Sequence, residues 1–265
     1  MRELSGRVAL ITGGANGIGL ALAEALASEG MHIALADIEE TALENAQQRI
    51  AAMGVQCITA KTDVSRPDQI AALARNVVEK LGAVHVLCSN AGVTGPVGDP
   101  LWELDFKEWQ RAFAINTEAA LHAIQHFVPH MLKLDEAHIV VTASIAGLVP
   151  SPIIPQYHAS KHALVSLTET LRHQLGRHAP QIGVSMVCPG AVDTQIMARE
   201  MSRHPTEKAG PARSDIPDDL YSDMVQPSDV AKAIVHAIRN RVFRVYPNRD
   251  SRQRIQERFA ELLAE

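Results

Sequence analysis

A tyrosine and a lysine stand four residues apart in the sequence, and together they could perform acid–base chemistry. Tyr157 and Lys161 lie in a segment of helical periodicity, so their side chains share one face of a helix. A free phenol has a pKa of about 10, and a neighbouring ammonium group stabilises the phenolate. We therefore expect Lys161 to lower the pKa of Tyr157 towards the range that is useful for proton transfer.

A serine lies 13 residues before Tyr157, directly after an apolar segment that we predict to be the fifth strand of a parallel sheet. Ligands of doubly wound sheets bind beyond the carboxyl ends of the strands, so the Ser144 hydroxyl could hydrogen-bond a substrate oxygen. Each residue also has a structural alternative. Ser144 could cap the strand, Tyr157 could pack in the core, and Lys161 could be a solvated helix charge.

A glycine-rich segment, Thr12-Gly13-Gly14-Ala15-Asn16-Gly17-Ile18-Gly19, follows the first predicted strand and opens a helix. Residues without side chains let backbone N–H groups and a helix N-terminus approach a pyrophosphate. We therefore predict a dinucleotide site at Gly13, Asn16, Gly17, Ile18 and Gly19. A tight strand-to-helix turn is the structural alternative, because such turns also favour glycine.

An aspartate closes the second predicted strand 18 residues after Gly19. This offset is close to the roughly 20 residues that separate a glycine loop from the carboxylate on the adenosine ribose. The carboxylate of Asp37 would also repel a 2′-phosphate, and neither Asn16 nor Ile38 supplies a compensating cation. The pattern predicts NAD in preference to NADP. The alternative is that Asp37 is the N-cap of a helix over 39–53.

Short apolar segments alternate with longer segments of helical period along the chain, which is typical of a parallel sheet buried beneath helices. The predicted strands are 7–12, 31–37, 55–61, 84–89, 138–143, 184–188 and 242–246. Helices are predicted between them, at 41–53, from Pro67, at 106–134 and 156–178, with an amphipathic helix at 252–265 that covers the sheet or a neighbouring subunit. The fold class is α/β, a doubly wound, mostly parallel seven-stranded Rossmann sheet with helices on both faces.

No repeat or linker divides the 265 residues, so we predict a single domain over residues 1–265. The one compositional break is 194–227, where four prolines stand among charges and methionines, and this segment is too long for an ordinary connection. We predict that it is a substrate lid. Ile154, with Ile196 and Met197 in the lid, could form an apolar substrate wall. Simple packing of the lid is the alternative.

Composition excludes several classes of protein. The chain carries 25 Lys plus Arg against 30 Asp plus Glu, a net charge of −5 without a basic run, which argues against nucleic acid and anionic membranes. Three scattered cysteines and no secretory leader favour a reducing cytoplasm, and no apolar stretch reaches the roughly 18 residues that span a bilayer. His122, His126 and His130 share helical spacing, but Pro129 interrupts them and no H-E-x-x-H occurs, so we predict no metal.

These motifs together resemble those of the short-chain dehydrogenase/reductase family, over nearly the whole chain and most clearly from Gly6 to about Thr194. The resemblance extends the predicted coenzyme site beyond the glycine loop and Asp37. Its further residues are Asp63 and Val64 (the family's D-V pair), Asn90, Ala91 and Gly92 (its N-A-G), and Pro189, Gly190, Val192 and Thr194 beside the nicotinamide.

The resemblance also implies an active-site tetrad of Asn116, Ser144, Tyr157 and Lys161. Tyr157 would exchange a proton with the alcohol or carbonyl oxygen, and Ser144 would orient that oxygen. Lys161 would lower the pKa of Tyr157 and hold the nicotinamide ribose, while Asn116 would hold a water that links Lys161 to solvent.

The implied function is an NAD-dependent oxidoreductase acting on a moderately hydrophobic secondary alcohol or its ketone. The implied assembly is a homo-oligomer, a dimer or tetramer built on the two long helices. The alternative function is a catalytically idle NAD-sensing module, which would keep the glycine loop but would typically lose Tyr157 or Lys161. A scaffold protein would not explain why Ser144, Tyr157 and Lys161 occur together.

Overall fold

The computed structural model describes residues 1–98, 100–203 and 223–264, and at its centre is a sheet of seven parallel strands. Their spatial order is β3-β2-β1-β4-β5-β6-β7. The strands are β1 Val8–Thr12, β2 His32–Asp37, β3 Cys57–Lys61, β4 Val86–Ser89, β5 Ala137–Thr142, β6 Ile182–Val187 and β7 Arg244–Val245. Every predicted strand is found within two residues of its expected ends. The predicted doubly wound Rossmann sheet is confirmed, and it is parallel throughout.

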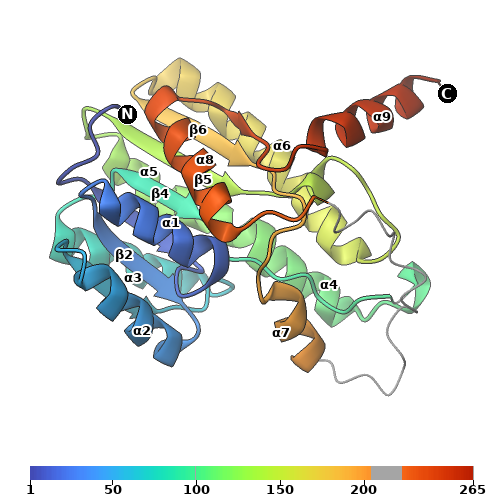
Figure 1. Ribbon diagram of the computed structural model, residues 1–265, viewed down its shortest axis with the longest axis horizontal. Helices are drawn as coiled ribbons and strands as arrows, with labels where there is room; N and C mark the ends of the chain where they lie inside the picture. The colour runs from blue at the N-terminus through green and yellow to red at the C-terminus, as the bar shows by residue number, and fades with distance from the viewer. Residues whose placement is uncertain (99, 204–222, 265) are drawn as a thin grey trace.

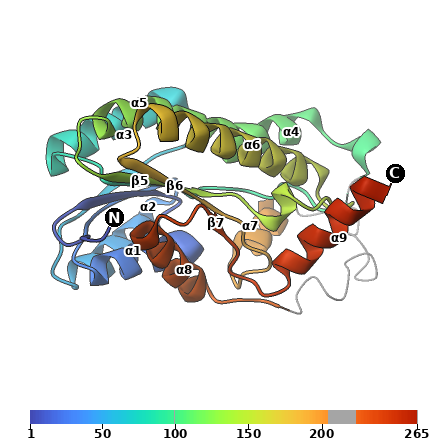
Figure 2. The same ribbon diagram turned by 90° about the horizontal axis from the view of Figure 1, so that it is seen from above.

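Helices cover both faces of this sheet (Figure 2). On one face lie α3 (Pro67–Leu81), α5 (Ala119–Met131) and α6 (Pro155–His178); on the other lie α1 (Gly17–Ser28), α2 (Glu40–Ala51) and α8 (Pro227–Asn240). Successive strand residues point to opposite faces, so that Leu10 packs in one core and Ile11 in the other. Both cores need apolar residues, which is why the strands are continuous apolar runs rather than alternating ones.

The helix predicted over 106–134 differs from the structure in its middle. It consists of α4 (Phe106–Phe113), a π-helical turn η2 (Ala114–Glu118) and α5, and a short 3-10 helix η1 (Leu101–Glu103) precedes it. In the π turn the N–H of Ala119 donates to the carbonyl of Ala114, five residues back. The apolar periodicity of the sequence does not indicate where a helical turn contains one extra residue. Such π-helical turns are frequent at functional sites.

The C-terminal helix α9 (Ser251–Ala264) projects away from the body (Figure 1). Its Phe259, Leu262 and Leu263 side chains are exposed, so the prediction that this helix covers the sheet is wrong for the described chain. Of the predicted lid 194–227, the structure describes 194–203, which include α7 (Ile196–Arg203), and 223–227. Residues 204–222 lie outside the described residues.

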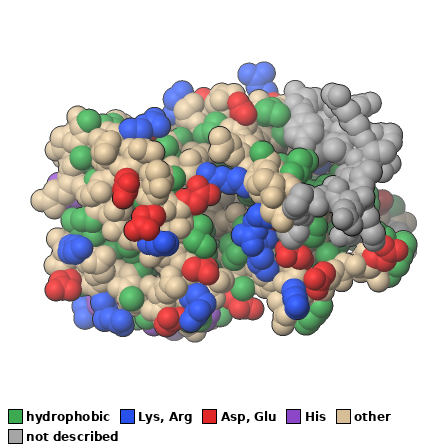
Figure 3. All heavy atoms as spheres, turned by 90° about the horizontal axis from the view of Figure 1, so that it is seen from below, with side chains coloured by type: hydrophobic (Ala, Val, Ile, Leu, Met, Phe, Trp, Pro, Cys, Tyr) green, Lys and Arg blue, Asp and Glu red, His purple; other side chains and the backbone are tan. Residues whose placement is uncertain are grey.

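The surface of the described residues carries charges of both signs. Figure 3 shows Lys and Arg side chains interspersed with Asp and Glu over the described part of one face. The three cysteines are free thiols. Among the described helices, none is long and apolar enough to cross a membrane.

One histidine is buried within the sheet. His138 on β5 is 1% exposed, and its Nε2 lies 2.8 Å from Ser185 Oγ, which itself donates to the carbonyl of Val242. This arrangement assigns the proton to Nε2, and Nδ1 is buried without a hydrogen-bond partner among the described residues. Burial, with the positive charges of the N-terminus and Arg241, lowers the pKa of His138 to about 3.

We expect neutral His138 to make the protein lose stability on acidification. Its folded pKa of about 3 lies below the ordinary 6.5, so between these pH values the unfolded chain binds the additional proton. Stability should therefore fall as the pH drops below 6.5, by about 1.4 kcal/mol per pH unit at most. Urea unfolding from about pH 7 to about pH 5 should show a smaller loss for His138→Gln than for the wild type. The exposed His130→Gln is the control, and equal losses in all three proteins would contradict the expectation.

Candidate active site

The candidate site lies at the carboxyl ends of the central strands, where Asn90 joins three of them. The Asn90 amide nitrogen donates to the carbonyls of Thr12 (3.1 Å) and Gly13 (3.3 Å), and its amide oxygen accepts from the Thr142 hydroxyl at 3.1 Å. The Thr12 hydroxyl in turn accepts from the backbone N–H groups of Asn90 and Ala91. These bonds lock the ends of β1, β4 and β5 against one another.

The glycine loop keeps its backbone uncovered for geometric reasons. Gly13 and Gly17 have φ values of +62° and +52°, in the left-handed region that favours glycine. A Cβ on Gly19 would lie 2.0 Å from the Gly13 carbonyl oxygen, so no other residue fits there. Asn16 is the N-cap of α1 but makes no capping bond, and its buried amide nitrogen has no partner among the described residues. A bare backbone turn with an orphaned donor fits a ligand that carries acceptor oxygens.

Asp37 connects this loop to the end of β2. The side chain is 9% exposed, and its two carboxylate oxygens accept from the N–H groups of Ala15 (3.1 Å) and Glu39 (3.2 Å). Helix α2 begins at Glu40 with Glu39 as its N-cap, so the alternative that Asp37 is the N-cap is wrong. The carboxylate therefore lies beside the glycine loop, where the adenosine ribose of a dinucleotide would fit.

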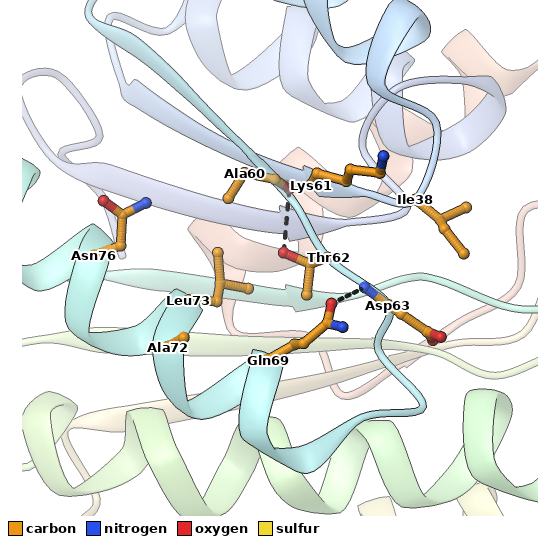
Figure 4. Close-up of a pocket in the computed structure, with 9 residues that line it drawn as sticks. All are labelled: Ile38, Ala60, Lys61, Thr62, Asp63, Gln69, Ala72, Leu73 and Asn76. Atoms are coloured by element: carbon orange, nitrogen blue, oxygen red, sulfur yellow. Dashed lines mark hydrogen bonds between the residues drawn. The ribbon is translucent and has the colours of Figure 1, made fainter.

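A pocket of about 480 Å³ opens beside this region, between β3 and α3 (Figure 4). Its lining residues are Ile38, Ala60, Lys61, Thr62, Asp63, Gln69, Ala72, Leu73 and Asn76. The Asp63 N–H donates to Gln69 Oε1 at 2.7 Å, and its carboxylate accepts from the N–H and hydroxyl of Ser65. Val64 is buried. Asp63 thus shapes the turn at this end of the site, and the pocket lies apart from the predicted tetrad.

Ser144, Tyr157 and Lys161 lie together beyond β5. Ser144 caps a 3-10 helix, η3 (Ile145–Gly147); its hydroxyl accepts from the Ala146 N–H at 3.1 Å and donates to the Pro189 carbonyl at 3.3 Å. The same hydroxyl lies near enough to the Tyr157 phenol to lower its pKa. Lys161, one helical turn after Tyr157, places its Nζ 5.6 Å from the centre of the phenol ring. The shared face predicted from their spacing is confirmed.

Burial sets the protonation of this pair. It raises the pKa of Tyr157, and the hydrogen bond with Ser144 lowers the pKa by less. The expectation of a lowered tyrosine pKa is therefore wrong for this structure, because the loss of solvent outweighs the stabilisation of the phenolate. Burial also lowers the pKa of Lys161, which is 3% exposed, to about 8. Lys161 donates to the Thr142 carbonyl at 2.9 Å, and this bond points the ammonium towards the strand ends.

Asn116 lies in the π turn and holds two segments of the site. Its amide oxygen accepts from the Val93 N–H, and its amide nitrogen donates to the Val93 carbonyl and to Ser160 Oγ, each at 2.9 Å. A Cβ on Gly92 would lie 3.2 Å from Asn116 Oδ1 and 3.5 Å from Lys161 Nζ, so the N-A-G segment passes directly beside both side chains. The side-chain amide is therefore used to position the backbone. The predicted water contact stays a prediction.

The segment predicted beside the nicotinamide is held by a residue that the sequence analysis missed. Asn248 is 3% exposed and accepts from the Gly190 N–H at 2.8 Å, while its amide nitrogen donates to the carbonyls of Ala191 and Asp223. Its only sequence signal is that it follows the last predicted strand. In the same segment Val192 pairs with Val225, and the Thr194 methyl lies 3.3 Å from where a Cβ of Gly17 would be.

The predicted substrate residues flank this arrangement. The Ile154 carbonyl accepts from the Tyr157 N–H at the start of α6, and Ile196 and Met197 form the first turn of α7. Their contact with a substrate stays a prediction. Among the described residues, no group of three or more His, Cys, Asp or Glu side chains could hold a metal ion.

We expect Asn248→Ala to loosen the segment that contains Pro189 and Gly190. The substitution leaves a buried N–H and two carbonyls without their partner, which should cost about 1 to 3 kcal/mol of unfolding free energy. Urea denaturation and NADH fluorescence titration would measure the losses of stability and of coenzyme affinity. Asn240→Ala, on the exposed end of α8, is the matched control. A loss no larger than that of the control would refute the positioning role of Asn248.

Known proteins resemble this chain in sequence and in fold. The family model of the short chain dehydrogenases matches residues 7–205. The 1-deoxy-11-beta-hydroxypentalenate dehydrogenase of Streptomyces exfoliatus is 33% identical over 258 residues, covering 97% of this chain and 88% of that protein. A short chain dehydrogenase/reductase from Burkholderia phymatum, solved in complex with NAD, is 38% identical with a TM-score of 0.89 and coverage of 100% and 96%. An alcohol dehydrogenase from Thermococcus sibiricus complexed with 5-hydroxy-NADP is 25% identical, with a TM-score of 0.77 and coverage of 91% and 96%.

Proposed function

The chain belongs to the short-chain dehydrogenase/reductase family of oxidoreductases, and we propose that it transfers hydride between NAD and a secondary alcohol or its ketone. The observation that carries the proposal is one hydrogen-bonded path from the acid–base pair to the glycine loop. Lys161 donates to the Thr142 carbonyl, the Thr142 hydroxyl donates to Asn90, and Asn90 donates to Gly13. The path supports a single site in which Tyr157 would transfer the proton and the glycine loop would bind the dinucleotide.

The protein's own groups would handle the proton and the orientation of the substrate. NAD, when bound, supplies the hydride acceptor or donor. In oxidation, the Tyr157 phenolate would take the proton of the substrate hydroxyl and become the phenol; in reduction, the neutral phenol would give its proton to the carbonyl oxygen and become the phenolate. Ser144, which lies near Tyr157, would orient that oxygen, and the Lys161 ammonium, 5.6 Å from the ring centre, would stabilise negative charge on the phenol.

Coenzyme preference follows from Asp37. This carboxylate accepts from the backbone beside the glycine loop, where it can also accept from ribose hydroxyls and where it repels a 2′-phosphate. The relative from Burkholderia phymatum was solved with NAD, whereas the more distant one from Thermococcus sibiricus was solved with an NADP derivative. The family accepts both coenzymes, and Asp37 supports NAD for this chain.

The substrate class is a small hydroxylated or keto compound with an apolar body. Ile154, Ile196 and Met197 would supply the apolar wall, and the related pentalenate enzyme is named for a hydroxylated substrate. We further propose a cytoplasmic homo-oligomer, a dimer or tetramer built on the long helices at 106–134 and 156–178, folded as a single domain over 1–265. The competing function, a catalytically idle NAD-sensing module, predicts NAD binding without turnover.

Replacing the phenol separates these two functions. Tyr157→Phe removes the proton-transfer oxygen but keeps the ring, so turnover should fall by about 100-fold or more while NADH binding persists. Nicotinamide absorbance with a panel of secondary alcohols and ketones, run with NAD and NADP in parallel, measures the rates. Fluorescence titration measures binding. Equal rates for the variant and the wild type would refute the role of Tyr157, and binding of NADH without any turnover by the wild type would favour the sensing module.

The pH profile of oxidation tests the role of Lys161. Lys161 Nζ lies 5.6 Å from the centre of the phenol ring, and we propose that the two groups share the loss of one proton near the Lys161 pKa of about 8, which leaves a phenolate beside an ammonium. On this proposal kcat/KM for alcohol oxidation should rise through this pH. In Lys161→Gln the ammonium is gone while burial still raises the pKa of Tyr157, so the rising limb should move to higher pH by about one unit or more. An unshifted limb with a uniformly lower rate would contradict the electrostatic role of Lys161.

A further inference from the structure

Two adjacent residues of α7 tie this helix to opposite sides of the site. Glu200 is buried, and its two carboxylate oxygens accept from the two terminal nitrogens of Arg111 on α4, each at 2.8 Å. Arg199 donates to Glu39 Oε2, just before α2, at 3.2 Å. Figure 1 shows α7 beyond the carboxyl ends of the strands, beside α4. Consecutive side chains therefore connect α7 to the helix that precedes Asn116 and to the end of the strand that carries Asp37.

The buried pair fixes the position of α7. A bidentate arginine–carboxylate pair has a defined geometry, and removing one partner would leave a buried charge. The hydrogen bond to Glu200 raises the pKa of Arg111, and Glu108 lies 3.3 Å from the same guanidinium. The Arg199–Glu39 pair is partly exposed, 37% and 46% for the two side chains, so it contributes little to stability. The Arg111–Glu200 ion pair therefore determines where α7 lies, and this position of α7 brings Arg199 to Glu39.

This geometry brings a guanidinium to the adenosine end of the predicted coenzyme site. The Glu39 N–H donates to the Asp37 carboxylate, which we expect to bind the adenosine ribose. The Arg199–Glu39 ion pair therefore lies two residues along the chain from that carboxylate. Thr194, shortly before α7, contacts the glycine loop at Gly17. Nearby, Glu40 is paired with Lys61 at 3.1 Å. Among the described residues, Arg199 and Lys61 are thus each engaged by a glutamate of this segment.

We propose that Glu39 is a second determinant of coenzyme specificity, in addition to Asp37, because it engages the guanidinium of Arg199. This inference rests on the proposed function. Arginine is the side chain best suited to a 2′-phosphate, which it binds through a planar pair of N–H donors. One terminal nitrogen of Arg199 donates to Glu39 Oε2, and the carboxylate offsets the guanidinium charge, so the planar pair of donors is less available to a 2′-phosphate. NADP binding is thus disfavoured both by the negative charge of Asp37 and by the ion pair that Glu39 forms with Arg199.

Binding of NADH and NADPH without substrate, followed by coenzyme fluorescence, tests this proposal. Glu39→Gln should tighten NADPH binding by about tenfold, the gain expected from one charge-assisted hydrogen bond, and should leave NADH affinity nearly unchanged. Glu40→Gln is the matched control, since it removes the same charge one residue later but releases Lys61 instead. It should change NADPH affinity much less.

A second pair of variants isolates the guanidinium. Adding Arg199→Gln to Glu39→Gln should abolish the NADPH gain, and adding Arg199→Lys should retain only part of it, because lysine lacks the planar fork. The proposal is overturned if Glu40→Gln gains as much as Glu39→Gln, or if the gain survives loss of Arg199. A wild type that binds neither NADH nor NADPH would instead contradict the proposed function. NADH binding by the wild type, with no NADPH gain in Glu39→Gln, would contradict this inference alone.

Discussion

The Asn90 side chain holds together the part of the sheet on which the rest of the site depends. An asparagine amide offers both a donor and an acceptor group, and this one uses them to bridge the ends of β1, β4 and β5. Parallel strands present their carboxyl ends at one edge, so this single bridge aligns the glycine loop after β1 with Thr142 at the end of β5. Lys161 then takes its position from the Thr142 carbonyl.

Burial gives the acid–base pair its electrostatic character. The same apolar surroundings raise the pKa of the phenol and lower that of the ammonium, so both groups are pushed towards their neutral forms. Lys161 Nζ lies 5.6 Å from the centre of the phenol ring, where an ammonium can stabilise a phenolate.

Contacts between residues far apart in the sequence complete the site. Asn116 fixes Val93 through a π turn, Asn248 fixes Gly190, and Arg111 holds α7 through Glu200. Each of these polar side chains satisfies backbone or charged groups that folding would otherwise leave unpaired. The loops around the proposed coenzyme and substrate are thus positioned by side chains that need not touch either ligand.

The sequence by itself determined the strands, the glycine turn, Asp37 at a strand end, and the helical spacing of Tyr157 and Lys161. These features depend on neighbouring residues: apolar periodicity, backbone freedom at glycine, and the repeat of a helix. Tertiary structure alone decided the π turn at Asn116, the contacts of Asn248 and the ion pair of Arg199 with Glu39. It also decided the exposed face of α9 and the raised pKa of Tyr157. Loss of solvent and pairing between distant side chains arise only when the elements pack, so no local pattern in the chain encodes them.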